Sequence, residues 1–243
     1  MRKIRAFIDQ PLAELTETTL PEAPAHHLLR VLRLRPGAEV HLFDGSGLEY
    51  PAEILSTSGR NECRVRLGAS SRPPVESALE VSLFQAICRG DRMDWCIQKA
   101  TELGVARIVP IVTERTEVRL DPARAEKRCR HWQQVAIAAA EQSGRVRVPP
   151  VDPPLAIADV AAGDDLGLFL DPCAEAGLTN LTGPPDGRCA LIIGPEGGLS
   201  PEETQHLQGQ GFQALRMGPR VLRTDTAGPV AIALLQARFG DLA

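Results

Sequence analysis

Hydrophobic and polar positions alternate with a period of two along much of the first seventy residues. A period of two is the pattern of a β-strand with one buried face. Turn-forming residues follow at 44–47 and 58–61, and residues 25–34 carry apolar positions at helical spacing. Short strands with such closely spaced turns predict a small β-barrel with one helix. The strands are expected at 39–43, 49–55 and 62–67.

A different pattern begins after residue 78, where continuous apolar runs alternate with helical periodicity. Such alternation predicts an α/β domain with a mainly parallel sheet. Helices are expected at 92–103, 121–143, from 200 onward and at 227–239, with Ser200 and Glu203 forming a capping box. The strands are expected at 79–88, 107–112, 166–170, 190–193 and 212–217.

The stretch between these two patterns is rich in serine, glycine and proline. It reads GASSRPPVESA over residues 68–78, a composition typical of a linker. We therefore expect a domain at residues 1–70, a linker at 71–78 and a second domain at 79–243.

Two loops of the second domain combine glycine with polar residues directly after a strand. The first is Gly194-Pro195-Glu196-Gly197-Gly198, and the second runs from Gly218 to Ala227. Open α/β sheets bind ligands at the carboxyl ends of their strands, where glycine lets the backbone approach a ligand closely. Neither loop has the spacing of a dinucleotide or nucleoside-triphosphate site. A plain strand-to-helix turn is the structural alternative for the first loop.

The second loop is more polar than a connection requires. The apolar helix that follows needs an N-cap, which we expect from Thr224, Asp225 or Thr226. Capping does not explain Arg223 just upstream, which makes this arginine a candidate functional residue.

Composition narrows the functional classes. Hydrophobic residues make up 43% and charged residues 24% of the 243 positions, with no membrane-length apolar run and no signal-peptide pattern. These features favour a cytoplasmic protein. The six cysteines and five histidines have no metal-site spacing, so no metal is expected.

The net charge of −4 does not favour a nucleic-acid partner, but phosphate contacts need only a local basic patch. Any one such group of basic residues is also consistent with a solvated surface. The groups are Arg30, Arg33 and Arg35; Arg124, Lys127, Arg128 and Arg130; and Arg145 and Arg147.

The two loops together resemble the paired cofactor loops of the SPOUT methyltransferases. The matching segments are LIIGPEGGLSPEE (191–203) and GPRVLRTDTA (218–227). Other stretches are similar to the bacterial branch that methylates N3 of a ribosomal uridine, so that the resemblance covers nearly the whole chain. They are HHLLRVLRLRPGAEVHLFDGSG (26–47), RGDRMDWCIQKATELGV (89–105), IVTERTEV (111–118), IAAAEQSGRVRVP (137–149) and LLQARFGDL (234–242).

The resemblance implies an N-terminal PUA-like barrel and a C-terminal trefoil-knotted α/β domain that acts as a homodimer. It implies S-adenosylmethionine as cofactor, with ribosomal RNA or the small ribosomal subunit as partner. RNA contacts are expected at Arg30, Arg33, Arg35 and Arg145. Two alternatives stay open: a 2′-O-ribose RNA methyltransferase of the same fold, and a catalytically silent RNA-binding homologue.

Methylation of uridine N3 requires a base that removes the N3 proton and a group that stabilises the resulting anion. Arg223 is the candidate for the stabilising cation, and the base is open between Asp225, Glu196 and Glu141. The family commonly has Glu where this chain has Asp225, which puts direct proton transfer there in doubt. Cofactor contacts are expected at Leu170, Leu191, Ile193, Gly194, Pro195, Glu196, Gly197, Gly198, Met217, Gly218, Val221, Leu222, Arg223, Thr224, Thr226 and Ala227.

Overall fold

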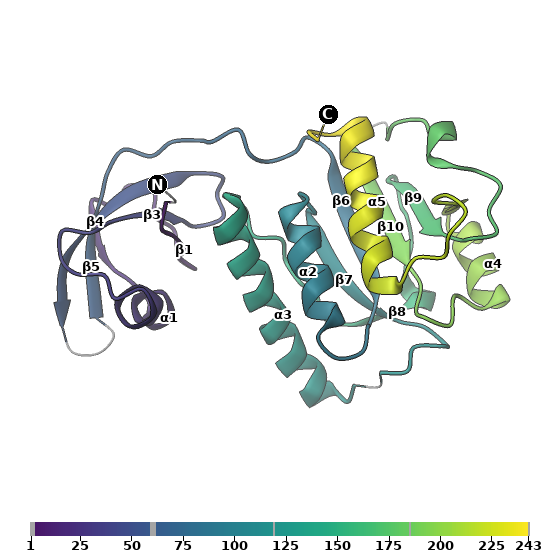
Figure 1. The fold of residues 1–243 in the computed structure, drawn as a ribbon, viewed down its shortest axis with the longest axis horizontal. Coiled ribbons are helices and arrows are strands. Elements are labelled where there is room, and N and C mark those ends of the chain that lie inside the picture. Colours follow the sequence, from purple (N-terminus) through teal and green to yellow (C-terminus); the bar gives the residue numbers. More distant parts are fainter. Residues whose placement is uncertain (1–2, 59–61, 119, 185, 243) are drawn as a thin grey trace. The chain divides into compact units, whose positions relative to one another are not determined.

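The structure is a computed structural model that describes residues 3–58, 62–118, 120–184 and 186–242 (Figure 1). The turn expected at 58–61 lies, apart from its first residue, outside the described residues. The chain forms two compact units. Unit 1 contains residues 1–76 and 140–148, and unit 2 contains residues 77–139 and 149–243.

Unit 1 is built on a five-stranded sheet, which confirms the predicted small β domain. Its strand order is β1-β3-β4-β5-β2, with β1 parallel to β3 and the other neighbours antiparallel. Buried and exposed residues alternate along β5, as the period of two requires. The two three-residue strands β1 and β2 are too short to show this pattern and were not predicted. The strands are β1 (Arg5–Phe7), β2 (Glu17–Thr19), β3 (Glu39–Phe43), β4 (Glu49–Ser58) and β5 (Glu62–Leu67).

The prediction of a single helix over 25–34 is wrong in its bounds and type. Helix α1 (Glu22–His26) continues as a π-helix, η1 (His27–Val31). The π-turn buries Leu28 completely while the chain turns, and Arg33 then adopts a left-handed φ of 56°. Apolar spacing cannot distinguish such a turn from an α-helix.

Residues 140–148 belong to unit 1 because Arg5 binds their backbone. The buried guanidinium of Arg5 donates to the carbonyls of Ala140 at 3.0 Å and Arg145 at 2.9 Å, and it pairs with Glu49 at 2.7 Å. Glu76 accepts from the backbone N–H of Val146 at 2.9 Å. Residues 140–148 were expected in the second domain. Nothing in their pattern of apolar and polar residues indicates that they belong with residues 1–76.

Unit 2 has a six-stranded sheet in which every neighbouring pair is parallel, as the apolar strands predicted. Its order is β11-β9-β10-β6-β7-β8. The strands are β6 (Glu80–Ala86), β7 (Arg107–Val112), β8 (Leu155–Ala156), β9 (Leu166–Leu170), β10 (Arg188–Ile193) and β11 (Gln213–Leu215). The longer helices are α2 (Arg92–Glu102), α3 (Pro122–Ser143), α4 (Pro201–Gly209) and α5 (Thr224–Phe239), and the short 3-10 helices are η2 (Ile157–Asp159) and η3 (Leu178–Asn180).

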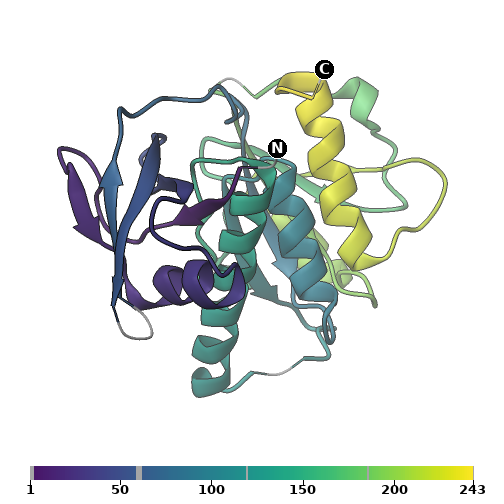
Figure 2. The ribbon, with the colours of Figure 1, turned by 60° about the vertical axis from the view of Figure 1, so that its left-hand side comes forward.

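Helices cover both faces of this sheet. Figures 1 and 2 show α2 and α5 side by side on one face. On the other face, Leu207 of α4 is buried in one cluster with Phe84 and Ile192. Since alternate residues of β6 and β10 enter the two layers, both strands are apolar throughout most of their length.

The helix ends follow the expected signals in most cases. At the start of α4, Glu203 N donates to Ser200 Oγ at 3.3 Å and Ser200 N to Glu203 Oε2 at 2.8 Å, which confirms the capping box. The expected N-cap of the last helix is wrong. Helix α5 begins at Thr224, so Arg223 is its N-cap and makes no side-chain cap bond.

No helix among the described residues is both long and apolar enough to cross a membrane. The strand pairings do not test the trefoil knot, which stays a prediction.

Candidate active site

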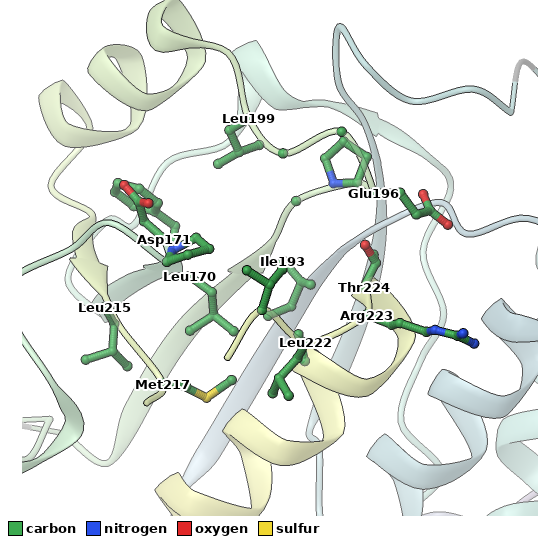
Figure 3. Close-up of a pocket in the computed structure, with 18 of the residues that line it drawn as sticks. Leu170, Asp171, Ile193, Glu196, Leu199, Leu215, Met217, Leu222, Arg223 and Thr224 are labelled. Atoms are coloured by element: carbon green, nitrogen blue, oxygen red, sulfur yellow. The ribbon is translucent and has the colours of Figure 1, made fainter. Parts of the chain in front are cut away.

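Three loops of unit 2 enclose a cavity of about 540 Å³ (Figure 3). They follow β9 and β10 and connect β11 to α5. Because β9, β10 and β11 are parallel neighbours, the loops meet at one edge of the sheet. Ligands of open α/β sheets bind at this position.

All but two of the expected cofactor contacts line the cavity. They are Leu170, Ile193, Gly194, Pro195, Glu196, Gly197, Gly198, Met217, Gly218, Val221, Leu222, Arg223, Thr224 and Ala227. The exceptions are Leu191, which is fully buried inside β10 between β6 and β9, and Thr226 in the first turn of α5.

The cavity also has lining residues that the sequence reasoning missed. They are Phe169, Asp171, Pro172, Leu199, Thr204 and Leu215; Arg220, which also lines it, lies in the predicted second loop but was not named as a contact. Asp171 and Pro172 form a third loop, directly after the strand that the sequence predicted at 166–170. A carboxylate at that position was the available signal, because the carboxyl ends of neighbouring parallel strands share an edge.

Arg115 fixes the glycine-rich loop from outside the cavity. Its Nη1 atom donates to the carbonyl of Gly197 at 2.9 Å. Glu203, which caps α4, accepts from the backbone N–H of Glu114 at 2.7 Å. The turn after β7 thus holds the middle of the glycine-rich loop and the first turn of α4.

The start of α5 is supported by a buried amide. Gln85 is fully buried near the end of β6, and its Nε2 atom donates to the carbonyl of Thr224 at 3.4 Å. A Cβ on Gly228 would lie 2.8 Å from Gln85 Oε1, so a larger residue there would displace the Gln85 amide from this position. Sequence reasoning missed Gln85, although an amide within an apolar strand was a usable signal.

Arg223 and Glu196 lie on the same side of the cavity. Figure 3 shows both side chains projecting away from Leu170 and Met217. The Arg223 backbone is fixed, since its carbonyl accepts from Ala227 N at 2.8 Å. Glu196 is 3.6 Å from Arg92 of α2, in an ion pair of partly exposed side chains.

The carboxylates of Glu196 and Asp225 share a neighbour, the thiol of Cys88. Burial and, after it, the repulsion of a thiolate by the two carboxylates raise the pKa of Cys88 to about 12. Cys88 is therefore a neutral thiol, and two candidate bases lie close to the end of β6.

The third candidate base, Glu141, lies in unit 1 and does not line the cavity. Its Oε1 atom accepts from the backbone N–H of Phe7 at 2.9 Å. Burial raises the pKa of Glu141, while this hydrogen bond opposes the shift. These contacts give Glu141 a structural role within unit 1.

The basic residues predicted to contact RNA differ in exposure. Arg30, Arg33 and Arg35 are exposed around the π-helix. Arg145 instead has a side chain only 7% exposed and pairs with Glu76 at 2.8 Å. A phosphate therefore has little access to Arg145. The sequence could not indicate this, because a group of basic residues gives no information on burial.

Comparisons with known proteins agree with this architecture. A family model described as an RNA methyltransferase domain matches residues 75–236, and an RNA methyltransferase PUA domain matches residues 20–68. Ribosomal RNA small subunit methyltransferase E of Mycobacterium bovis is 36% identical over 85% of this chain and 80% of that protein. The Bacillus subtilis protein of the same name is 31% identical over 91% of this chain and 93% of its own length.

A crystal structure of ribosomal RNA small subunit methyltransferase E from Neisseria gonorrhoeae, bound to S-adenosyl methionine, superposes with a TM-score of 0.92. It is 35% identical and covers 100% of both chains. The fold and the cavity thus define an RNA methyltransferase with a PUA-like domain and an α/β methyltransferase domain. The chain belongs to the ribosomal RNA small subunit methyltransferase E family.

Proposed function

We propose that this chain transfers the methyl group of S-adenosylmethionine to N3 of a specific uridine in small-subunit ribosomal RNA. The observation that carries the proposal is the cavity at the carboxyl edge of the parallel sheet, bounded by the two predicted loops. Its volume of about 540 Å³ lies within the usual range of small-molecule sites. Family membership and the S-adenosyl methionine bound to the Neisseria gonorrhoeae relative support the same reading.

The residues of the cavity fit this cofactor. Apolar side chains such as Leu170 and Ile193 suit an adenosine, and the backbone of Gly194–Gly198 supplies close polar groups. A Cβ at Gly218 would meet no protein atom within 4 Å, so the space beside this lining residue is open. Glu196 and Asp171 place negative charge around the site of a sulfonium cation. When bound, S-adenosylmethionine supplies an electrophilic methyl group.

Arg223 is assigned to the uracil oxygens. Removal of the N3 proton spreads negative charge onto the two flanking carbonyl oxygens, and a fixed guanidinium stabilises that charge. The Arg223 backbone is rigid because it forms the N-cap of α5. Asp225 and Glu196 are the remaining candidates for the base. Glu196 lines the cavity, and Asp225 lies in the first turn of α5, close enough to Cys88 to repel its thiolate.

RNA would be bound in part by the exposed Arg30, Arg33 and Arg35 of unit 1. Such a substrate places the enzyme in the cytoplasm. We further propose a homodimer formed through α5 and the loop before it, because Leu234 is 38% and Val221 79% exposed. Light scattering after size-exclusion chromatography tests the dimer.

The reaction is tested in cells. Ribosomal RNA from a strain lacking the gene is mapped by mass spectrometry, with and without an added copy of the gene. We expect one small-subunit uridine to lose its N3-methyl group and to regain it with the wild-type copy. A methyl group lost from a ribose hydroxyl, or an unchanged RNA, contradicts the proposal.

A further inference from the structure

A second, smaller cavity of about 150 Å³ lies beside the start of α2. Its walls are the segment 87–90 after β6, Val118 and Leu120 before α3, and Arg128 and Trp132 of α3. These residues all belong to unit 2, and none of them lines the 540 Å³ cavity. Because β6 is the neighbour of β10, both cavities lie at the carboxyl edge of the same sheet.

The nitrogen groups in these walls are hydrogen-bond donors. Arg89, Arg128 and Trp132 are lining residues, and their guanidinium and indole N–H groups can only donate. Trp132 is only 2% exposed, and its Nε1 atom has no acceptor among the described residues. A buried donor without an acceptor costs free energy and is rare in native proteins. An acceptor-rich ligand would remove this cost.

The positive charge at this pocket is also incompletely neutralised. Arg128 is exposed and has no ion pair among the described residues, whereas Arg124 and Arg130 on the same helix pair with Asp121 and Glu126. Arg89 pairs with Glu117, but both side chains are more than half exposed. Such a surface pair contributes little, so an incoming anion can replace it.

The start of α2 adds a further positive contribution. This helix begins at Arg92, two residues after the lining residue Gly90, and its N-cap Asp91 makes no side-chain cap bond. The positive end of the helix dipole and the first backbone N–H groups are therefore available near the pocket. Arg92 also pairs with Glu196, which connects this turn to the cofactor loop.

We propose that this cavity, the Trp132 pocket, binds a phosphate group of the RNA substrate; the inference rests on the proposed function. A phosphate presents only acceptors, which matches the two guanidinium groups and the indole N–H. A nucleobase would also present N–H donors, for which the guanidinium and indole groups offer no acceptor. A phosphate held here would keep the RNA strand beside Arg92 and the loop that carries Glu196.

The first test compares Arg128→Ala with Arg124→Ala. Both changes remove one exposed positive charge from α3, but only Arg128 lines the pocket. Binding of a small-subunit ribosomal RNA fragment is measured by fluorescence anisotropy at several salt concentrations. We expect the log–log salt slope to fall by about one for Arg128→Ala, because one phosphate contact is lost, and to stay unchanged for Arg124→Ala.

The second test is Trp132→Phe, which keeps an aromatic ring in the wall and removes the N–H. We expect weaker RNA binding with unchanged affinity for S-adenosylmethionine, and a melting curve controls for folding. Two results would overturn the assignment of the Trp132 pocket as a phosphate site. One is an equal salt slope in the two arginine variants, and the other is wild-type RNA affinity in a folded Trp132→Phe protein. Neither result contradicts the proposed reaction. Wild-type protein without affinity for either the RNA fragment or the assembled small subunit overturns the proposed function itself.

Discussion

Arg115 holds the glycine-rich loop of the cofactor cavity through the carbonyl of Gly197, to which its Nη1 atom donates at 2.9 Å. Arg115 does not line the cavity. Its own turn is fixed, because Thr113 N donates to Thr116 Oγ1 at 3.0 Å. The shape of the cavity therefore depends on a side chain outside it.

Replacing Arg115 by Ala should weaken S-adenosylmethionine binding about tenfold or more, since a hydrogen bond to a charged group contributes about 1.5–3 kcal/mol. Isothermal calorimetry measures the affinity. Arg188→Ala is the control, because Arg188 pairs with Asp165 away from the cavity. Equal affinities in the two variants would show that the loop keeps its shape without Arg115.

Gly218→Leu should abolish S-adenosylmethionine binding by filling the cavity. Gly218 has a φ of 71° and no protein atom within 4 Å of an added Cβ. Gly163 is a matched control, with a φ of 61° and equally open surroundings but no place in the cavity wall. Both leucine variants should lose similar stability from backbone strain. Calorimetry that finds cofactor binding intact in a folded Gly218→Leu protein would refute the assignment.

The parallel sheet could be predicted from the sequence because its strands are long and apolar. The 107–112 and 166–170 strands are confirmed as β7 and β9 with the expected bounds. The short strands β1, β2 and β8 were not predicted, since two or three residues carry no periodicity, whereas the equally short β11 lies within the strand expected at 212–217. Sequence periodicity also could not show that Arg5 binds residues 140–148.

The two cofactor loops could be predicted because glycine and polar residues follow apolar strands. Asp171 was missed because its loop contains no glycine-rich signal. Arg115 and Gln85 act through hydrogen bonds to distant backbone, at Gly197 and Thr224, which one-dimensional spacing does not reveal.

Glu141→Gln should raise the melting temperature at neutral pH. Burial raises the pKa of Glu141, so the folded protein binds a proton there more readily than the unfolded chain. The stability from this group is therefore present below the unfolded pKa and is lost as pH rises through the folded pKa. Glutamine keeps an acceptor for Phe7 N and removes the buried charge.

Melting curves of wild type and Glu141→Gln between pH 4 and 8 test this prediction. The difference in melting temperature between the two proteins should become smaller toward pH 4. A variant less stable than wild type at pH 7 would contradict the account. Loss of turnover without loss of stability would instead identify Glu141 as the base.

Arg223→Ala should reduce turnover about a hundredfold or more, as removal of one oxyanion donor does. Its melting temperature and cofactor affinity should stay near wild type, because the side chain is exposed and makes no cap bond. Arg223→Lys should restore only part of the rate, since an ammonium lacks the planar fork. Single-turnover methylation at saturating RNA measures the effect. Normal turnover in the alanine variant would show that Arg223 has no catalytic role.

Methyl transfer by the purified chain tests the central claim most directly. The protein is incubated with small-subunit ribosomal RNA, or with the assembled subunit, and S-adenosylmethionine carrying a deuterated methyl group. The RNA is then digested to nucleosides for mass spectrometry. We predict that the label appears in N3-methyluridine. Label in a 2′-O-methylated nucleoside, or no label in either substrate, would contradict the account.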